Sequence, residues 1–204
     1  MPEPPDAGDR ATVALLPWGQ VIEDFLGSIG LTVDGFLDDM SGGWLFGYVE
    51  ALASAGVRSV LVCPSESVTA PTRRTHRPTG APVWLLPPTR AWRAARRRVA
   101  DPYAWSPADA VPFGASRANR VRALVAHHLL PWLATPPVAL ARVLRAEGCR
   151  AVLCQEYEDA RFDVCLAVGR ASGVPVYGTF QGGDRSRTPA ERRVRSWAVR
   201  AAAG

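Results

Sequence analysis

Short apolar runs alternate along this chain with segments whose apolar residues recur every three or four positions. The runs are four to six residues long and end at proline, glycine or polar residues, which is typical of strands buried on both faces of a sheet. We expect five such strands, at Ala11–Leu16, Val57–Val62, Val83–Leu86, Ala151–Cys154 and Val174–Thr179.

The segments between these runs have helical periodicity and end at glycine. Trp44, Leu45, Tyr48, Val49 and Leu52 lie on one helical face ahead of Gly56. Further helices are expected near 21–26 and 31–38, around 138–144, at 159–172 and at 189–203, the last opened by a capping box of Thr188, Pro189 and Glu191. Alternating strands and helices predict an α/β protein with a Rossmann-like, doubly wound parallel sheet.

The amino-acid composition agrees with this α/β fold and excludes several other classes of protein. The 204 residues are 48% hydrophobic and 21% charged, a balance that excludes collagen and coiled-coil classes and predicts one domain at 11–204 behind a disordered tail at 1–10. The most apolar stretch, Ala123–Ala141, is interrupted by two histidines and three prolines, so we expect no membrane-spanning helix. The acidic, proline-rich start is unlike a signal peptide, and we expect a cytoplasmic protein.

The charge is concentrated in the middle of the chain. Residues 1–66 carry a net charge of −8, whereas residues 67–150 carry +11, all of it from arginine. Segment 65–136 is variable in pattern and rich in arginine and proline, and Arg90–Arg98 places arginines around Trp92. A solvated basic face and a helix that binds an anionic membrane surface both fit this pattern. No nucleic-acid motif accompanies it, and we expect no nucleic-acid partner.

Candidate site residues follow three of the expected elements. Gly42 and Gly43 precede a helix, where exposed backbone N–H groups favour an anion. Gln155 and Glu156 follow one strand, and Gln181 and Asp184 flank two glycines after the next. For each of these groups, the competing interpretation is a turn or a helix start with no role in binding. The four cysteines form no C-x-x-C pair and the histidines no i, i+4 pair, so we expect neither a metal nor a cofactor.

Three of these segments together resemble the N-terminal domain of retaining glycosyltransferases of family four, which have the two-domain GT-B fold. The resemblance rests on SGGWLFGYVEALASAGVRSVLVCP, AVLCQEYEDARFDVCLAVGRASG and VPVYGTFQGGD, at residues 41–64, 151–173 and 174–184. It implies transfer of a sugar from a nucleotide-sugar donor to a sugar, lipid-linked or small-molecule acceptor. The donor would be bound mainly by a second Rossmann-like domain that has no match in this sequence.

The resemblance also implies roles for the candidate residues. Gly42 and Gly43 would face the donor diphosphate, Gln181 and Asp184 would lie near the transferred sugar, and Glu156 would lie near the acceptor. Gln181 and Glu156 would be the catalytic residues. Gln155 and Gln181 stand where the family often has histidine. Glutamine does not titrate near pH 7, so we do not expect Gln181 to act as a general base. The resemblance implies that the donor phosphate takes the acceptor's proton.

Two other classes of function use the same sheet. A dinucleotide-dependent oxidoreductase predicts G-x-G-x-x-G after the first strand and an acid at the end of the second. Leu16-Pro17-Trp18-Gly19 and Cys63-Pro64 provide neither. A non-catalytic binding or membrane-docking module, peripheral at the inner membrane surface, stays open as the alternative.

Overall fold

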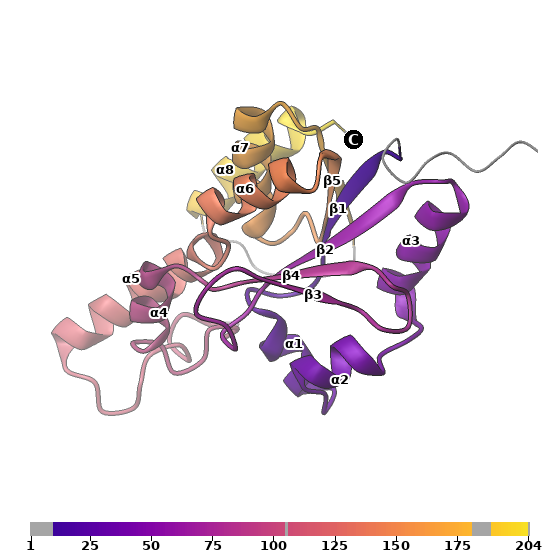
Figure 1. The fold of residues 1–204 in the computed structure, drawn as a ribbon. Coiled ribbons are helices and arrows are strands. Elements are labelled where there is room, and N and C mark those ends of the chain that lie inside the picture. The colour runs from indigo at the N-terminus through magenta and orange to yellow at the C-terminus, as the bar shows by residue number, and fades with distance from the viewer. Residues whose placement is uncertain (1–9, 105, 181–188, 204) are drawn as a thin grey trace, which may run out of the picture.

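The computed structural model describes residues 10–104, 106–180 and 189–203, and its centre is one six-stranded sheet (Figure 1). The strand order is β3-β4-β2-β1-β5-β6, and neighbouring strands are parallel except for the antiparallel pair β3–β4. The strands are β1 (Thr12–Leu16), β2 (Arg58–Pro64), β3 (Thr72–Thr75), β4 (Pro82–Leu86), β5 (Cys149–Gln155) and β6 (Val176–Thr179).

Helices cover both faces of this sheet, as the doubly wound class requires. One face packs against α1 (Ile22–Ser28), α2 (Val33–Asp38) and α3 (Gly43–Ser54), and the other against α6 (Pro137–Ala146), α7 (Arg161–Ser172) and α8 (Pro189–Ala201). Two further helices, α4 (Arg90–Arg96) and α5 (Arg117–Leu133), extend from one end of the sheet. The predicted Rossmann-like α/β fold is confirmed.

The apolar runs become central strands because both of their faces are buried. Val60 and Val62 of β2 pack in the core on the α6–α7 side, whereas Leu61 and Cys63 pack on the α1–α3 side. Such a strand has no solvated face, so its sequence is a continuous apolar run. All four cysteines are free and buried.

Strand β3 was not predicted from the sequence. Its residues, Thr72-Arg73-Arg74-Thr75, are polar and largely exposed, and they pair only with β4, from Thr72 beside Leu85 to Thr75 beside Pro82. An edge strand needs no apolar face, and charged side chains on it discourage pairing with other chains. The pattern of hydrophobic residues therefore could not predict β3.

The middle segment is more regular than its prolines suggested. Helix α5 runs through Pro131 without a break. By length and composition, 117–146 is the one candidate for a membrane span among the described residues, but a core helix passes the same test. The stretch consists of two helices, since α5 ends at Leu133 and α6 begins at Pro137.

The final helix buries only some of its apolar residues. Ala198 is fully buried, whereas Val194 and Trp197 are 37% and 46% exposed. The guanidinium of Arg170 lies over the Trp197 ring, 5.4 Å from its centroid. The largest side chain of α8 that is buried is Arg195, which reaches the loop after β5. Thr188, the expected N-cap, lies outside the described residues.

Candidate functional site

The topology places a switch point between β1 and β5, at whose carboxyl ends open α/β sheets form their ligand crevice. The chain leaves β1 toward β2 on one side, and β5 then pairs with β1 on the other, so the connections that follow these two strands diverge to opposite faces. Ligands of open α/β sheets bind at such a switch point, beyond the carboxyl ends of the strands. The loops there are Pro17–Val21 after β1 and Glu156–Ala160 after β5.

Gln155, the last residue of β5, is the most unusual side chain at this edge. It is only 1% exposed, and neither its amide oxygen nor its amide nitrogen has a hydrogen-bond partner among the described residues. Strand alternation places it on the same face as Leu153, which packs on the α1–α3 side. Buried amides are normally satisfied, so this group is available to a ligand or to bound water.

Arg161, at the first position of α7, connects the two loops of the crevice. Its guanidinium is buried, and Nη1 donates a hydrogen bond to the backbone oxygen of Pro17. Burial alone would lower its pKa, but Cys154, Asp159 and other nearby groups raise the pKa above its ordinary value, so the group is a cation. Nε and Nη2 have no hydrogen-bond partner in the described part of the chain.

The loop after β5 is held in an uncommon conformation. Glu156 has a φ of 66°, in the left-handed region that residues other than glycine seldom adopt. Arg195 of α8 donates hydrogen bonds to the backbone oxygens of Tyr157 and Asp159, and its Nη2 lies 3.3 Å from Oδ2 of Asp163. Helix α8 thus holds the loop that carries Glu156, which keeps the strained residue in place.

The loop and helix after β1 bring further polar groups to the same edge. The hydroxyl of Tyr103 donates to Oδ2 of Asp24 at 2.8 Å and accepts from the backbone N–H of Gln20 at 3.2 Å. Burial, followed by the charge of Asp24, raises the pKa of Tyr103, which therefore remains a neutral phenol. The Gln20 side chain accepts from Nε1 of the buried Trp92 at 3.1 Å.

The balance of charge at this edge favours hydroxyl groups over phosphate. Five carboxylates belong to α1 and to the loop after β5: Glu23, Asp24, Glu156, Glu158 and Asp159. Glu23, Asp24 and Asp159 already accept hydrogen bonds from groups of this chain, so it is their charge that bears on a ligand. Burial, with Asp24 and Glu23 adding to it, also raises the pKa of the adjacent Glu66. Carboxylate oxygens accept hydrogen bonds from sugar hydroxyls but repel phosphate. The five carboxylates outnumber the two buried cations, Arg161 and Arg195, so this edge suits a polyol better than an anion.

Gly42 and Gly43 lie apart from this polar group. They begin α3, which packs against β2, and β2 is separated from β5 by β1. Both glycines are exposed, have φ of 75° and 69°, and have no atom within 4 Å of where a Cβ would stand. Gly42 provides no side-chain cap for the first N–H groups of α3. Trp44, 38% exposed, stands beside them.

The structure therefore brings together Gln155 and Glu156 but does not bring Gly42 and Gly43 into contact with them. Gln181 and Asp184 lie outside the described residues. Sequence reasoning missed Arg161 and Tyr103. No sequence motif marks Arg161, but an arginine within the mainly apolar segment 160–168 could have indicated a buried cation.

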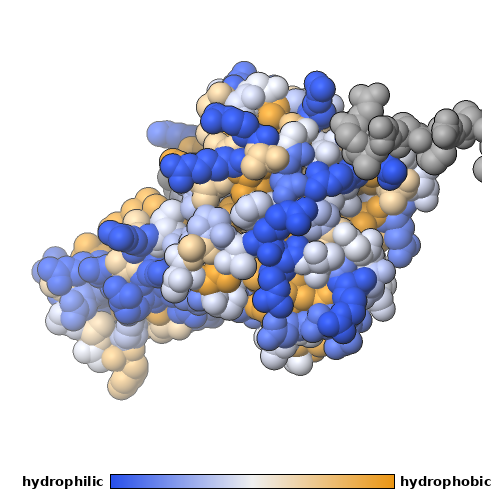
Figure 2. Space-filling model, in the orientation of Figure 1, coloured by the Kyte–Doolittle hydropathy of each residue, from blue (hydrophilic) through white to orange (hydrophobic). Residues whose placement is uncertain are grey.

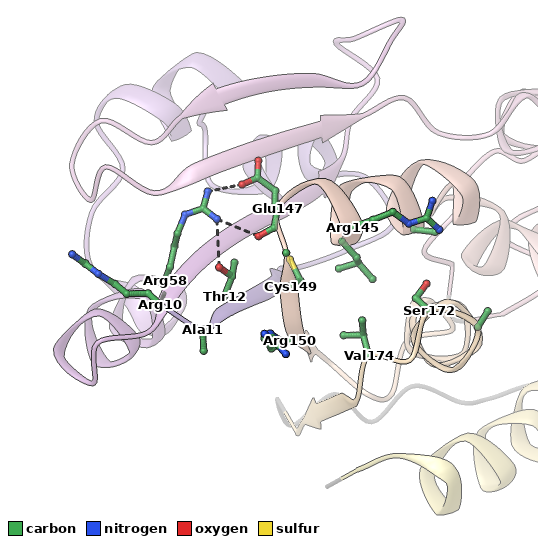
Figure 3. Close-up of a pocket in the computed structure, with 14 residues that line it drawn as sticks. Arg10, Ala11, Thr12, Arg58, Arg145, Glu147, Cys149, Arg150, Ser172 and Val174 are labelled. Carbon is green, nitrogen blue, oxygen red and sulfur yellow. Dashed lines mark hydrogen bonds and ion pairs between the residues drawn. The ribbon is translucent and has the colours of Figure 1, made fainter. Parts of the chain in front are cut away.

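A cavity of about 940 Å³ lies at the opposite edge of the sheet, at the amino ends of the strands (Figure 3). Glu147 borders it and accepts hydrogen bonds from Arg58, Arg73 and Trp84, which lower its pKa to about 2 although burial opposes that shift. These groups satisfy one another, and the cavity is far from the switch point. Its polar contacts are those of a structural ion-pair cluster.

His76 is held by contacts within the fold. His76 is buried, stacks on Phe46 and hydrogen-bonds through its two nitrogens to Thr79 and to the backbone oxygen of Met40. Burial lowers its pKa, so it is neutral. Among the described residues no group of three histidine, cysteine or acidic side chains could hold a metal ion.

Comparison with known proteins returned no match, neither to a family model, nor to a curated protein, nor to a solved structure.

Proposed function

We propose that this chain is the acceptor-binding part of a GT-B type glycosyltransferase, with the acceptor's hydroxyl groups in the crevice between β1 and β5. In this proposal Gln155 and Glu156 bind the acceptor, and Gly42 and Gly43 face the donor diphosphate. Gln181 and Asp184 lie near the transferred sugar. A second Rossmann-like domain supplies most of the contacts to the nucleotide sugar.

The observation that carries the proposal is the buried amide of Gln155, which has no hydrogen-bond partner in the described ranges 10–104, 106–180 and 189–203. An amide both donates and accepts hydrogen bonds, as a sugar hydroxyl does, and this one is buried at the switch point where α/β folds bind ligands. The excess of carboxylates at this edge also favours a polyhydroxyl ligand over an anionic one, because carboxylates accept hydrogen bonds and repel phosphate. A dinucleotide cofactor is disfavoured, because Pro17-Trp18-Gly19-Gln20 lacks the glycine pattern that the pyrophosphate requires.

The glycine positions support a divided site. Carboxylates at the crevice repel phosphate, whereas the uncapped N-terminus of α3 has no acidic residue in its first turn. An anion bound there is stabilised by the helix dipole and by free N–H groups. Acceptor and diphosphate would thus occupy separate surfaces, with the reacting atoms between them.

The test uses saturation-transfer NMR on the chain with a panel of hexoses, inositol and a nucleoside diphosphate. We expect transfer to a sugar or polyol in the wild type and its loss in Gln155→Met. The matched control is Arg150→Gln, at the opposite edge of the sheet, which should bind as the wild type does. Absence of binding to every polyol, or binding that Gln155→Met leaves unchanged, would contradict the proposal.

A further inference from the structure

Helix α5 has two apolar faces, and only one of them is covered. Ala123, Ala126 and Leu130 are buried against Trp92 and Ala95 of α4 in a small core of their own. On the other side, Val121, Val125 and Leu129 recur at intervals of four and are 56%, 52% and 47% exposed. We call these three residues the α5 stripe. At ~1.5 Å per residue, the 17-residue helix is about 25 Å long.

Arginines border this stripe. Arg117 lies one helical turn before Val121, and Arg122 lies one turn before Val125, so both are neighbours of the stripe on the helix surface. Arg117, Arg120 and Arg122 lie near the N-terminus of α5, where positive charges are unfavourable because of the helix dipole, and α5 has no acidic residue in its first turn to offset them. The packing of α5 does not use these cations, because all three are exposed.

The neighbouring segments extend the same combination of charge and apolar surface. Residues 90–133 contain eight arginines and two aspartates, and α4 packs directly against α5. Phe113, in the loop ahead of α5, is fully exposed. In Figure 2 the end of the molecule formed by α4 and α5 carries hydrophilic and hydrophobic surface side by side.

We propose that the α5 stripe and its arginines form a surface that docks on an anionic lipid bilayer, with the helix lying in the interface plane. Aliphatic side chains enter the acyl boundary while arginines contact the headgroup phosphates, which explains both the exposed stripe and the flanking charge. The Trp92 of the basic helix α4 takes no part, because it is fully buried. This corrects the expectation that Arg90–Arg98 presents a tryptophan to the membrane.

The charge of this surface argues against other occupants. A second copy of the chain would bring two sets of arginines together across an apolar contact, which like charges disfavour. Single-stranded nucleic acid binds through several aromatic side chains on which successive bases stack, whereas the stripe is aliphatic and Phe113 is the exposed aromatic side chain beside it. The docking proposal does not depend on the proposed function, and each has its own readout.

The test measures co-sedimentation of the chain with vesicles of phosphatidylcholine alone and of phosphatidylcholine mixed with phosphatidylglycerol. We expect binding to the anionic vesicles only, weakening as salt is raised. Replacing Arg117, Arg120 and Arg122 by glutamine should lower the partition coefficient roughly 100-fold, since each cation near the surface contributes about fivefold. The control removes the same charge elsewhere, at the exposed Arg142, Arg145 and Arg150, and should stay close to the wild type.

The apolar half of the proposal has its own pair of variants. Serine at Val121, Val125 and Leu129 should lower partitioning roughly tenfold or more, whereas serine at the exposed Ile29, Val194 and Val199 should not. Circular dichroism checks folding, and the single Val125→Ser variant serves if the triple variant unfolds. Equal binding to neutral and anionic vesicles, or a lipid-free dimer that the stripe variants dissociate, would overturn the proposal.

Discussion

Two buried glutamines at the same edge of the sheet allow the proposed site to be tested through stability. Gln155 and Gln20 are each 1% exposed. The Gln20 side chain accepts a hydrogen bond from Nε1 of Trp92, whereas the Gln155 amide has no partner among the described residues. Methionine is close to glutamine in length and volume, so replacing each in turn removes the amide while largely preserving the packing.

The two substitutions should have opposite effects on the free energy of unfolding. An unsatisfied buried polar group costs about 1–3 kcal/mol. Gln155→Met removes such a group, and we expect a gain of roughly 1–2 kcal/mol and a rise in Tm of about 2–8 °C for a chain of this size. Gln20→Met leaves the Trp92 N–H without its acceptor, and we expect a loss of about 1–3 kcal/mol.

Urea unfolding followed by circular dichroism measures both values, with equal m-values confirming that the denatured states are comparable. Together with the loss of polyol binding, a stabilised Gln155→Met variant would identify a residue that is kept for a ligand at a cost in stability. A Gln155→Met variant destabilised by more than about 1 kcal/mol would refute the reasoning, because the amide would then have a structural partner.

Three further predictions concern other parts of the molecule. A Cβ at Gly169 would lie 2.6 Å from a backbone oxygen just before β6, so Gly169→Ala should destabilise the protein by about 1–3 kcal/mol. Gly47, in α3, has open space around this position, so Gly47→Ala should stabilise by about 0.5–1 kcal/mol, and thermal unfolding of the two variants tests both values. Gly43→Val should cost about 1–2 kcal/mol from its positive φ and, in a complete enzyme, cut transfer by orders of magnitude; normal turnover by the folded variant would count against the glycine loop. The pKa of Glu147 is about 2 in the folded protein, below its ordinary value, so its contribution to stability is complete above about pH 4.5 and is lost as the pH falls toward 2. Glu147→Gln should flatten the dependence of stability on pH in that window, and an unchanged profile would show that the contacts with Arg58 contribute nothing.

The apolar runs by themselves determined most of the sheet. Each run predicted as a strand is a strand, because a parallel strand buried on both faces must be apolar at every position. The helices ending at Gly148 and Gly173 were equally legible, since both glycines have the positive φ that terminates a helix. Strand β3 and the uninterrupted helix through Pro131 gave no such signal, because an exposed edge and a helix packed by only one face leave the pattern ambiguous.

The sequence also located Gln155 and Glu156 at the carboxyl edge, because strand ends can be predicted and the chemistry of α/β folds lies there. Only the tertiary structure decided that the Gln155 amide is buried with no partner in the part of the chain that is described, that Arg161 reaches Pro17, and that Arg195 holds the loop between them. It likewise decided that Trp92 faces inward while Val121, Val125 and Leu129 face outward. Periodicity shows that a helix has apolar faces, but which face is covered depends on neighbours that are distant in sequence.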